Sequence, residues 1–484
     1  MLPPAIDSLQ DSYQDAGRCL EQIEVFVDYL LCESLTVGRV FGSQELDDLC
    51  QQIGHRNLET LEIAEPPQAT SDVAIYIASK LQSSGGHTAA LLDVMRLSPK
   101  RRSIILVTGA CGRTDYKAVH RRLSEAPNVE LVNVPPVGHL QKLSWIQTFL
   151  HEQAPSIVWL FNHHQDSVAV AAVQPDRGYD LNFYHHGDDR LCLGVCLSFG
   201  THFDISPVLF HKCRNEVGVK GNRYLPLTAT DLLGGSLKNK HESSGLVTCT
   251  AAGFNKVEVG YFIQYVDVIP RLLHVTGGCH IHIGRLSKFA RWRIHTQMKH
   301  LGVPRESFVY IPLVHSVWQA LHDYKVDLYI ASFPYGGGKT MVEVMGASVP
   351  IIIHRNIADR MIGGLDMVYD GACSWREPEE LYQLLKIYNR DFLREQGTLA
   401  RVWYEKYHST QVISEILTNP NFSIEAPQLK PGYAADPLLH AWQIAMEVTF
   451  LGVIKRHLWR IYRRFKSILG RHSFADFLKG SNEL

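Results

Sequence analysis

The stretch VDLYIASFPYGGGKTMVEVMGASVPIIIH, residues 326–354, sets the architecture that much of the chain repeats. Its two apolar runs, VDLYIASF and VPIIIH, are typical of buried parallel strands. Between them, Lys339 to Ala347 predicts a helix, which is entered through Gly336, Gly337 and Gly338. Glycines let a backbone approach a ligand closely and direct N–H groups at it, and the helix N-terminus adds partial positive charge. This combination predicts an anion site, most often for phosphate.

The GGGKT sequence also raises a nucleotide-triphosphatase hypothesis. A P-loop requires a Gly, four residues and then Gly-Lys-Ser/Thr, and Phe333 occupies the position of the first Gly. A turn without a ligand is a second alternative, because glycines are common at such turns. We favour a phosphate site of another class, with Lys339 and Thr340 at the start of the helix. Glu343 lies one helical turn further on, within reach of a ribose hydroxyl beside the phosphates.

In order along the chain come a strand, a glycine turn, a helix that carries Glu343, the pattern Gly-x-x-x-Pro at 346–350 and an apolar strand. This order resembles the nucleotide-sugar site of GT-B glycosyltransferases. Within that fold it is similar to the group around O-GlcNAc transferase and the bacterial protein N-glucosyltransferases, without their helical repeats. The resemblance covers roughly residues 71–410. It implies a UDP-sugar donor, either GlcNAc or hexose, a hydroxyl or amide acceptor, and no further cofactor.

The alternation of strand and helix patterns from Asp72 onward predicts an α/β chain with parallel, doubly wound sheets. Together with the resemblance, it leads us to expect the GT-B plan of two Rossmann-like domains facing each other across a cleft. The expected segments are a helical N-terminal extension at 1–67, an acceptor domain at 71–225, a linker at 226–245, a donor domain at 246–415 and a basic amphipathic helical tail at 437–475.

The composition is that of an ordinary globular protein. The 484 residues are 45% hydrophobic and 20% charged, which is enough chain for two or three domains with full cores. The net charge of −1 gives no overall attraction to nucleic acid, so no such partner is expected. Ten cysteines without paired spacing, and no signal-peptide pattern at the N-terminus, predict a cytoplasmic protein with reduced thiols. The chain has no apolar run of about 18 residues, so no membrane-spanning helix is expected.

The acceptor side is expected at the carboxyl ends of the N-terminal strands, where polar residues gather. His87 follows a small, glycine-containing loop after the first strand. One interpretation makes Thr88 a helix N-cap and leaves His87 exposed. The other makes His87 a general base or a sugar contact, because the pKa of histidine suits removal of a hydroxyl proton near neutral pH.

Two further strands end in clusters of histidine and aspartate, at 162–166 and 184–190. Such residues ligate zinc, manganese and iron. However, adjacent residues of a strand point to opposite faces, so each His-His pair offers a shared ion one side chain. We therefore expect no metal, and we expect His186 and Asp188 to contact the acceptor or the donor. A network of solvated polar side chains is the remaining alternative.

On the donor side, the resemblance implies that Asn255 and Lys256, after the first strand of the second domain, supply a cation to the diphosphate. A solvated surface lysine is the alternative. Lys339 would add a second charge, and cations with helix N–H groups would then expel the nucleoside diphosphate without a metal. Many retaining GT-B enzymes carry a second Glu eight residues before the helix Glu. Here, counting back from Glu343, that position is Tyr335, which favours an inverting, single-displacement mechanism.

Two functional classes stay open from the sequence. The first is the sugar transferase. The second is a nucleotide-binding regulatory or assembly protein that keeps the fold without turnover, and a nucleotide-sugar epimerase of the same fold is a related alternative.

Residues 448–474 carry an apolar stripe at helical spacing, surrounded by basic residues. This tail would either lie on the anionic inner face of a membrane or pack on the N-terminal domain. The acceptor is expected to be a glycan, a lipid-linked molecule or a protein, and the membrane interpretation favours one that is lipid-linked or assembled at that face.

Overall fold

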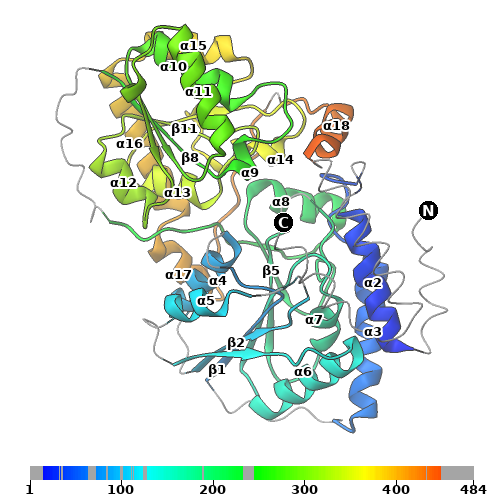
Figure 1. Ribbon diagram of the computed structural model, residues 1–484. Coiled ribbons are helices and arrows are strands. Elements are labelled where there is room, and N and C mark those ends of the chain that lie inside the picture. The colour runs from blue at the N-terminus through cyan, green and yellow to red at the C-terminus, as the bar shows by residue number, and fades with distance from the viewer. Residues whose placement is uncertain are drawn as a thin grey trace.

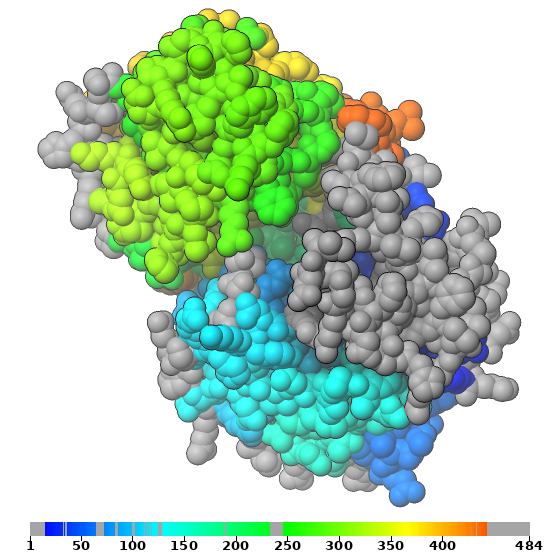
Figure 2. Space-filling model, viewed as in Figure 1, coloured from blue at the N-terminus to red at the C-terminus, as the bar shows by residue number. Residues whose placement is uncertain are grey.

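The computed structural model describes residues 15–31, 33, 36–63, 72–82, 86–98, 102–110, 112, 114–123, 128–187, 190–232, 245–431 and 433–447. Two parallel sheets with helices on their faces form two lobes, the N-terminal one lower and the C-terminal one upper in Figure 1. The lobes are distinct masses in the space-filling view (Figure 2). The predicted pair of doubly wound α/β domains is therefore confirmed.

The N-terminal sheet pairs seven strands in the described residues, all parallel, in the order β3-β2-β1-β4-β5-β6-β7. The central strands are buried on both faces because helices cover both, which explains their unbroken apolar sequences. The strand order reverses between β1 and β4, and ligands bind at such a switch point in open α/β sheets. The strands are β1 (Val73–Ala78), β2 (Arg102–Val107), β3 (Val129–Asn133), β4 (Ile157–Phe161), β5 (Asp180–His185), β6 (Thr201–Asp204) and β7 (Arg223–Tyr224).

Helices of this lobe come both from the alternating region and from the N-terminal segment. Leu20 of α2 and Ile53 of α3 are buried in the same apolar core as Ile75 of β1 and Val158 of β4. The N-terminal helices therefore complete the core of the N-terminal lobe, and they line its right side in Figure 1. The elements are α2 (Ala16–Leu30), α3 (Gln44–Thr60), α4 (Gly86–Leu97), α5 (Tyr116–Leu123), α6 (His139–Gln153), α7 (Ser167–Ala172), α8 (Pro207–Lys212) and the π-helix η2 (Cys213–Val217).

The C-terminal sheet pairs six strands, also parallel, in the order β10-β9-β8-β11-β12-β13 within the described residues. Its switch point lies between β8 and β11. The strands are β8 (Val247–Ala251), β9 (Cys279–Ile283), β10 (Phe308–Ile311), β11 (Leu328–Ile330), β12 (Ile351–His354) and β13 (Cys373–Trp375). The helices are α9 (Phe254–Val257), α10 (Tyr265–Thr276), α11 (Lys288–His300), α12 (Val317–Asp323), α13 (Lys339–Gly346), α14 (Arg360–Gly363), α15 (Pro378–Ile387), α16 (Arg390–Tyr407) and the short 3₁₀ turns η3 (Arg305–Ser307) and η4 (Leu365–Met367).

The chain crosses back to the N-terminal lobe through α17 (Thr410–Thr418), which lies against α4 in Figure 1. Ile413 and Ile416 are buried in the N-terminal core, and the Ser414 hydroxyl donates to the Leu97 carbonyl over 3.1 Å. The segment that links the lobes is fixed beside this crossing, because the Thr228 hydroxyl donates to the His408 carbonyl over 2.6 Å. Two chain passages thus join the lobes on one side of the cleft.

The last described helix is α18 (Pro437–Glu447), the start of the predicted tail. His440 contacts the Asp359 carboxylate over 3.2 Å, which holds α18 beside α14. The stripe predicted at 448–474 lies outside the described residues. Within the part of the chain that the structure describes, no helix combines the length and apolarity needed to cross a bilayer.

Candidate functional site

The glycine turn between β11 and α13 is shaped by another stretch of the same lobe. The Gly336 N–H donates to the Ile362 carbonyl over 2.8 Å, and a Cβ at Gly336 would lie 2.1 Å from the Gly363 oxygen. Any larger residue would push the two backbones apart. The close approach that Gly336 permits is therefore to protein backbone, whereas the sequence predicted an approach to a ligand. Anion binding falls to the first turn of α13, since the first N–H groups of a helix have no intrahelical partner.

Lys256 lies against this turn, and its predicted contact with a diphosphate stays a prediction. It occupies α9, a short helix that follows β8, and its ammonium donates to the Gly336 carbonyl over 2.7 Å. The preceding residue, Asn255, is exposed. A half-buried lysine so close to the start of α13 adds positive charge where the helix N–H groups converge, which favours a phosphate over a neutral ligand.

Lys339, the first residue of α13, forms an ion pair across the cleft with Asp93 of α4. The side chains are 26% and 16% exposed, so the pair is shielded from water but not enclosed. Burial raises the pKa of the Asp93 carboxyl, and the charge of Lys339 opposes that rise. Lys339, the second cation predicted for the donor site, thus pairs with a carboxylate of the opposite lobe. Thr340, the next residue, is half-buried at the start of the helix.

Glu343 is half-buried on α13, with its carboxylate held at the start of α12. The backbone N–H groups of Val317 and Trp318 face this carboxylate. Burial raises its pKa, while Lys339 and the two N–H groups act in the opposite direction. A carboxylate has about four acceptor positions, which leaves room for ribose hydroxyls. The ribose contact stays a prediction, and the start of α12 is the element that faces the side chain.

A second loop completes this edge, and the sequence interpretation missed it. The buried Asn356 amide donates to the Pro334 carbonyl over 3.0 Å, and its oxygen accepts from the Ala358 N–H over 2.8 Å. Gly364 has a φ of +73°, and a Cβ there would lie 2.8 Å from the Met341 side chain. The Ile-Gly-Gly sequence at 362–364 was the available signal, because paired glycines often mark close backbone contact.

On the N-terminal side, one buried carboxylate joins the ends of three strands. The Ser79 hydroxyl, after β1, donates to Asp166 over 2.6 Å, and the Thr108 hydroxyl, after β2, donates to the same oxygen. Ser79 also accepts the His163 N–H over 2.7 Å, and His163 follows β4. Asp166 in addition caps α7 through the Ala169 N–H. This network fixes His163 at the carboxyl edge of the sheet.

Three histidines meet at that edge: His163 follows β4, His186 follows β5, and His87 lies in the first turn of α4. The ring centres of His87 and His186 lie 4.0 Å apart, and those of His87 and His163 lie 4.7 Å apart. Burial lowers the pKa of all three, and for His87 the neighbouring imidazoles lower it further. The site therefore carries neutral imidazoles at neutral pH. Ligand nitrogens of the three lie within 4.8 Å of one another, a spacing that a polar substrate or an ion can bridge.

His87 is a positioned group and not an exposed helix-cap neighbour. One ring nitrogen, Nε2, lies 3.0 Å from the Phe161 carbonyl oxygen. A carbonyl oxygen can only accept a hydrogen bond, so the imidazole must be the donor. Nε2 therefore carries the hydrogen, and Nδ1 carries the lone pair that a general base needs. Thr88 is buried, and its hydroxyl accepts the Gln82 N–H over 2.9 Å inside a helix that begins at Gly86, so it is not the N-cap.

The structure brings together most of the predicted site residues on two facing edges. His87 and His186 meet on one edge, and Lys256, Glu343 and the glycine turn meet on the other. Asp188 lies outside the described residues. His163 was missed as the third partner, because the sequence argument weighed each His-His pair without counting His87 beside it.

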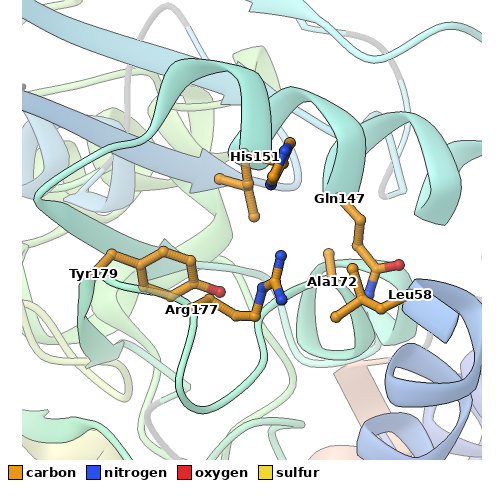
Figure 3. A pocket seen from close by; sticks show the side chains of 7 residues that line it. Leu58, Gln147, His151, Ala172, Arg177 and Tyr179 are labelled. Carbon is orange, nitrogen blue, oxygen red and sulfur yellow. The ribbon is translucent and has the colours of Figure 1, made fainter. Parts of the chain in front are cut away.

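A small cavity elsewhere is lined by residues of α3, α6, α7 and the turn before β5, and Figure 3 shows their side chains around it. Tyr179 lines it and precedes β5 directly, which places the cavity at the amino ends of the strands. Ligand sites of open α/β sheets form at the carboxyl ends. The cavity is therefore unrelated to the candidate site.

Two parallel sheets, with a glycine turn and a helix start at the edge of one and polar strand ends at the edge of the other, define a protein of GT-B fold. Anabaena Alr3699/HepE in complex with UDP aligns with a TM-score of 0.53 at 13% identity, over 72% of this chain and 99% of that chain. The same protein in complex with UDP-glucose aligns at 0.51, with 13% identity over 72% and 98%. TarM aligns at 0.50, with 10% identity over 72% and 98%. No protein-family model and no curated protein matches the sequence.

At these identities the likeness establishes the fold. It spans nearly the whole of each of the three matched chains, so both lobes and their connection are shared. The GT-B fold expected from the glycine turn is thereby confirmed. Donor, acceptor and chemistry must be argued from the residues of this chain.

Proposed function

We propose that this protein is a glycosyltransferase that moves a sugar from a UDP-sugar to a hydroxyl or amide acceptor. The main observation behind the proposal is that the carboxyl edges of the two sheets carry different functional groups. A glycine turn, Lys256 and Glu343 stand on one edge, and a neutral, oriented His87 stands on the other. The HepE structures hold UDP and UDP-glucose in the same fold, which supports a nucleotide-sugar donor.

The donor would bind to the C-terminal lobe through its diphosphate and ribose. The start of α13 and the Lys256 ammonium would take the phosphates, and the Glu343 carboxylate would accept the ribose hydroxyls. Negative charge grows on the leaving diphosphate as the sugar bond breaks, so fixed N–H groups and a cation stabilise the transition state more than the ground state. Lys339 would add its charge when the diphosphate displaces Asp93 from it.

The acceptor would be activated from the N-terminal lobe. The lone pair on His87 Nδ1 would take the acceptor proton as the acceptor oxygen or nitrogen attacks the anomeric carbon. A base whose pKa lies below neutral holds its lone pair ready at physiological pH, and such proton transfer contributes about 10² to 10⁴ in rate. A single displacement of this kind inverts the anomeric configuration, and it uses charge from the protein in place of a metal.

A donor and acceptor screen tests the proposal. The full chain is mixed with a panel of UDP-sugars and with pooled hydroxyl and amide acceptors, and UDP release is measured together with product mass. A mass increase of one sugar, with UDP release that depends on the acceptor, is the expected result. Saturable UDP binding without any acceptor-dependent release would instead place the protein among nucleotide-binding proteins without turnover. Interconversion of UDP-sugars without an acceptor would indicate an epimerase.

We further propose that the basic tail places the protein at a membrane surface, where it would bind its acceptor. Residues 448–474 would bind an anionic bilayer, which suits a lipid-linked acceptor, because each cation near such a surface adds about 1 kcal/mol. Sedimentation with liposomes tests this, using the full chain and a chain that ends at Glu447, which keeps the described α18. Binding that requires both the tail and anionic lipid supports it, and binding that ignores either one refutes it.

A further inference from the structure

A second cluster of potential ligands lies in the core of the N-terminal lobe, apart from the cleft histidines. His185 ends β5, His202 and Asp204 lie on β6, and Cys213 begins the π-helix η2. The side chains of His185, Asp204 and Cys213 are fully buried, and that of His202 is 4% exposed. Each residue offers one ligand atom, and the four atoms lie within 4.8 Å of one another.

The fold explains why these residues converge. His185 and Asp204 are register partners on the adjacent strands β5 and β6, so their side chains share a face of the sheet. His202 lies two residues before Asp204 and therefore shares that face. Cys213 approaches from η2, and π-helical segments are rare and frequent at functional sites. Three ligands thus come from the sheet and the fourth closes over them.

The contacts converge on a point and do not pair off. His185 Nδ1 lies 3.0 Å from Asp204 Oδ1 and 3.3 Å from Cys213 Sγ, yet an imidazole nitrogen carries at most one hydrogen. The same Asp204 oxygen lies 3.0 Å from His202 Nε2. A tetrahedral zinc ion with bonds of about 2.0 to 2.3 Å sets its ligand atoms about 3.3 to 3.7 Å apart. These three distances need to widen by only a few tenths of an ångström, and all four ligand atoms lie within 4.8 Å of one another.

The surroundings also fit a coordination sphere. The Asn222 amide donates to the other carboxylate oxygen, Asp204 Oδ2, over 2.6 Å, and to the Phe210 carbonyl over 2.9 Å. Such a bond to the non-ligating oxygen of a carboxylate is what fixes a metal ligand in orientation. The Phe183 ring lies 5.1 Å from His202 and 5.7 Å from His185, which shields the cluster from water.

We propose that His185, His202, Asp204 and Cys213 bind one zinc ion in a closed, structural site. Nitrogen, oxygen and thiolate ligands with tetrahedral spacing suit zinc, and four protein ligands leave no open position for a substrate. On binding, the Cys213 thiol releases its proton to solvent, and both imidazoles stay neutral with their hydrogens on the nitrogens away from the ion. The ion would hold the end of β5, so that His186, the next residue, is fixed at the cleft.

Elemental analysis of the purified full chain tests this site. After dialysis against a weak chelator, we expect about one zinc per chain, in line with tight structural sites. The variants Cys213→Ser and His202→Gln should lose it. The controls Cys196→Ser, a half-buried cysteine outside the cluster, and His87→Ala, a cleft histidine, should retain it.

A second measurement covers the case in which the variants fail to fold. The wild-type chain, stripped of metal and loaded with cobalt(II), should show a thiolate-to-cobalt charge-transfer band and tetrahedral d–d absorption. A folded wild-type chain that holds no zinc and takes up no cobalt would overturn the proposal, and the cluster would then be a hydrogen-bonded network around Asp204. Zinc that is lost with His87→Ala but kept with Cys213→Ser would overturn it as well, by placing the ion in the cleft.

Discussion

The two cleft edges share a sheet plan and differ in chemistry. On the N-terminal edge, strand ends carry imidazoles whose pKa burial lowers, so they are neutral lone-pair donors. On the C-terminal edge, a glycine turn, a helix start and Lys256 gather positive charge beside the carboxylate of Glu343. Loops alone create this difference, because both edges lie at the carboxyl ends of parallel strands. One edge is suited to moving a proton and the other to holding an anion.

The histidines of the two lobes also differ in where they lie relative to the strands. In the C-terminal lobe, His280 and His282 lie inside β9, where the Tyr265 hydroxyl contacts them over 2.9 and 2.8 Å. Both are fully buried. In the N-terminal lobe, His186 directly follows β5, and His87 lies in the first turn of α4, where its ring contacts that of His186. The position of a histidine relative to the strands therefore decides whether it packs inside the sheet or lies at the carboxyl edge.

The largest expected effect comes from removing the proton acceptor. His87→Ala should lower turnover by about 10² to 10⁴ while leaving UDP affinity unchanged, because the base acts on the acceptor and not on the donor. Steady-state kinetics with a donor and acceptor pair from the screen measure this. His55→Ala, an exposed histidine on α3, is the matched control. Full turnover in His87→Ala would remove His87 from the mechanism.

The next effect concerns the opposite edge. Glu343→Ala should weaken UDP binding by about 1 to 3 kcal/mol, the range for a hydrogen bond that involves a charged group. Glu343→Gln should lose less, since it keeps one acceptor oxygen for the ribose. Calorimetric titration with UDP measures both, with the exposed Glu379→Ala as the control. Equal affinity in Glu343→Ala and the wild type would contradict the ribose assignment.

Acid should destabilise the folded protein through the buried histidines of the C-terminal lobe. Burial lowers the pKa of His280 to about 3 and that of His354 to about 3, against about 6.5 in the unfolded chain. Below pH 6.5 these histidines are protonated in the unfolded chain but stay neutral in the folded chain. The free energy of unfolding therefore decreases as the pH is lowered, until the pH reaches the pKa of the folded state. At pH 5.5 each histidine should cost about 1.4 kcal/mol of unfolding free energy.

Denaturant unfolding at several pH values measures this loss. His354→Gln should flatten the pH dependence between pH 6.5 and 5.5 by its share, about 1 kcal/mol. The exposed His55→Gln should leave the curve unchanged. The same acid slope in His354→Gln and the wild type would show that this histidine is not held neutral by the fold.

The smallest effect is expected at the ion pair across the cleft. Asp93→Asn should free Lys339 for the diphosphate and tighten UDP binding about two- to fivefold, because partly exposed ion pairs are worth about 0.2 to 1 kcal/mol. Asp391→Asn, an exposed carboxylate on α16, is the charge-matched control. Weaker UDP binding in Asp93→Asn would mean that the pair helps to form the site and does not compete with it.

The sequence predicted what depends on local pattern. Strand and helix alternation, the glycine turn before α13 and the placement of His87 and His186 at the carboxyl edge of the sheet all follow from periodicity and turn chemistry. The sequence did not reveal that Gly336 accommodates the Gly363 backbone, that Lys339 pairs with Asp93, or that His163 joins the other two histidines. Each of these contacts joins residues that are distant in the chain, and no local pattern encodes such a distance.

The division of work between the lobes is tested most directly by titrating UDP into the wild type, His87→Ala and Lys256→Ala by calorimetry. We predict one UDP per chain for the wild type and the same dissociation constant for His87→Ala. Lys256→Ala should bind about ten- to a hundredfold more weakly, as expected for loss of a charge-assisted hydrogen bond. A wild-type chain that does not bind UDP, or affinity that falls with His87→Ala and survives Lys256→Ala, would contradict the assignment of the donor to the C-terminal lobe.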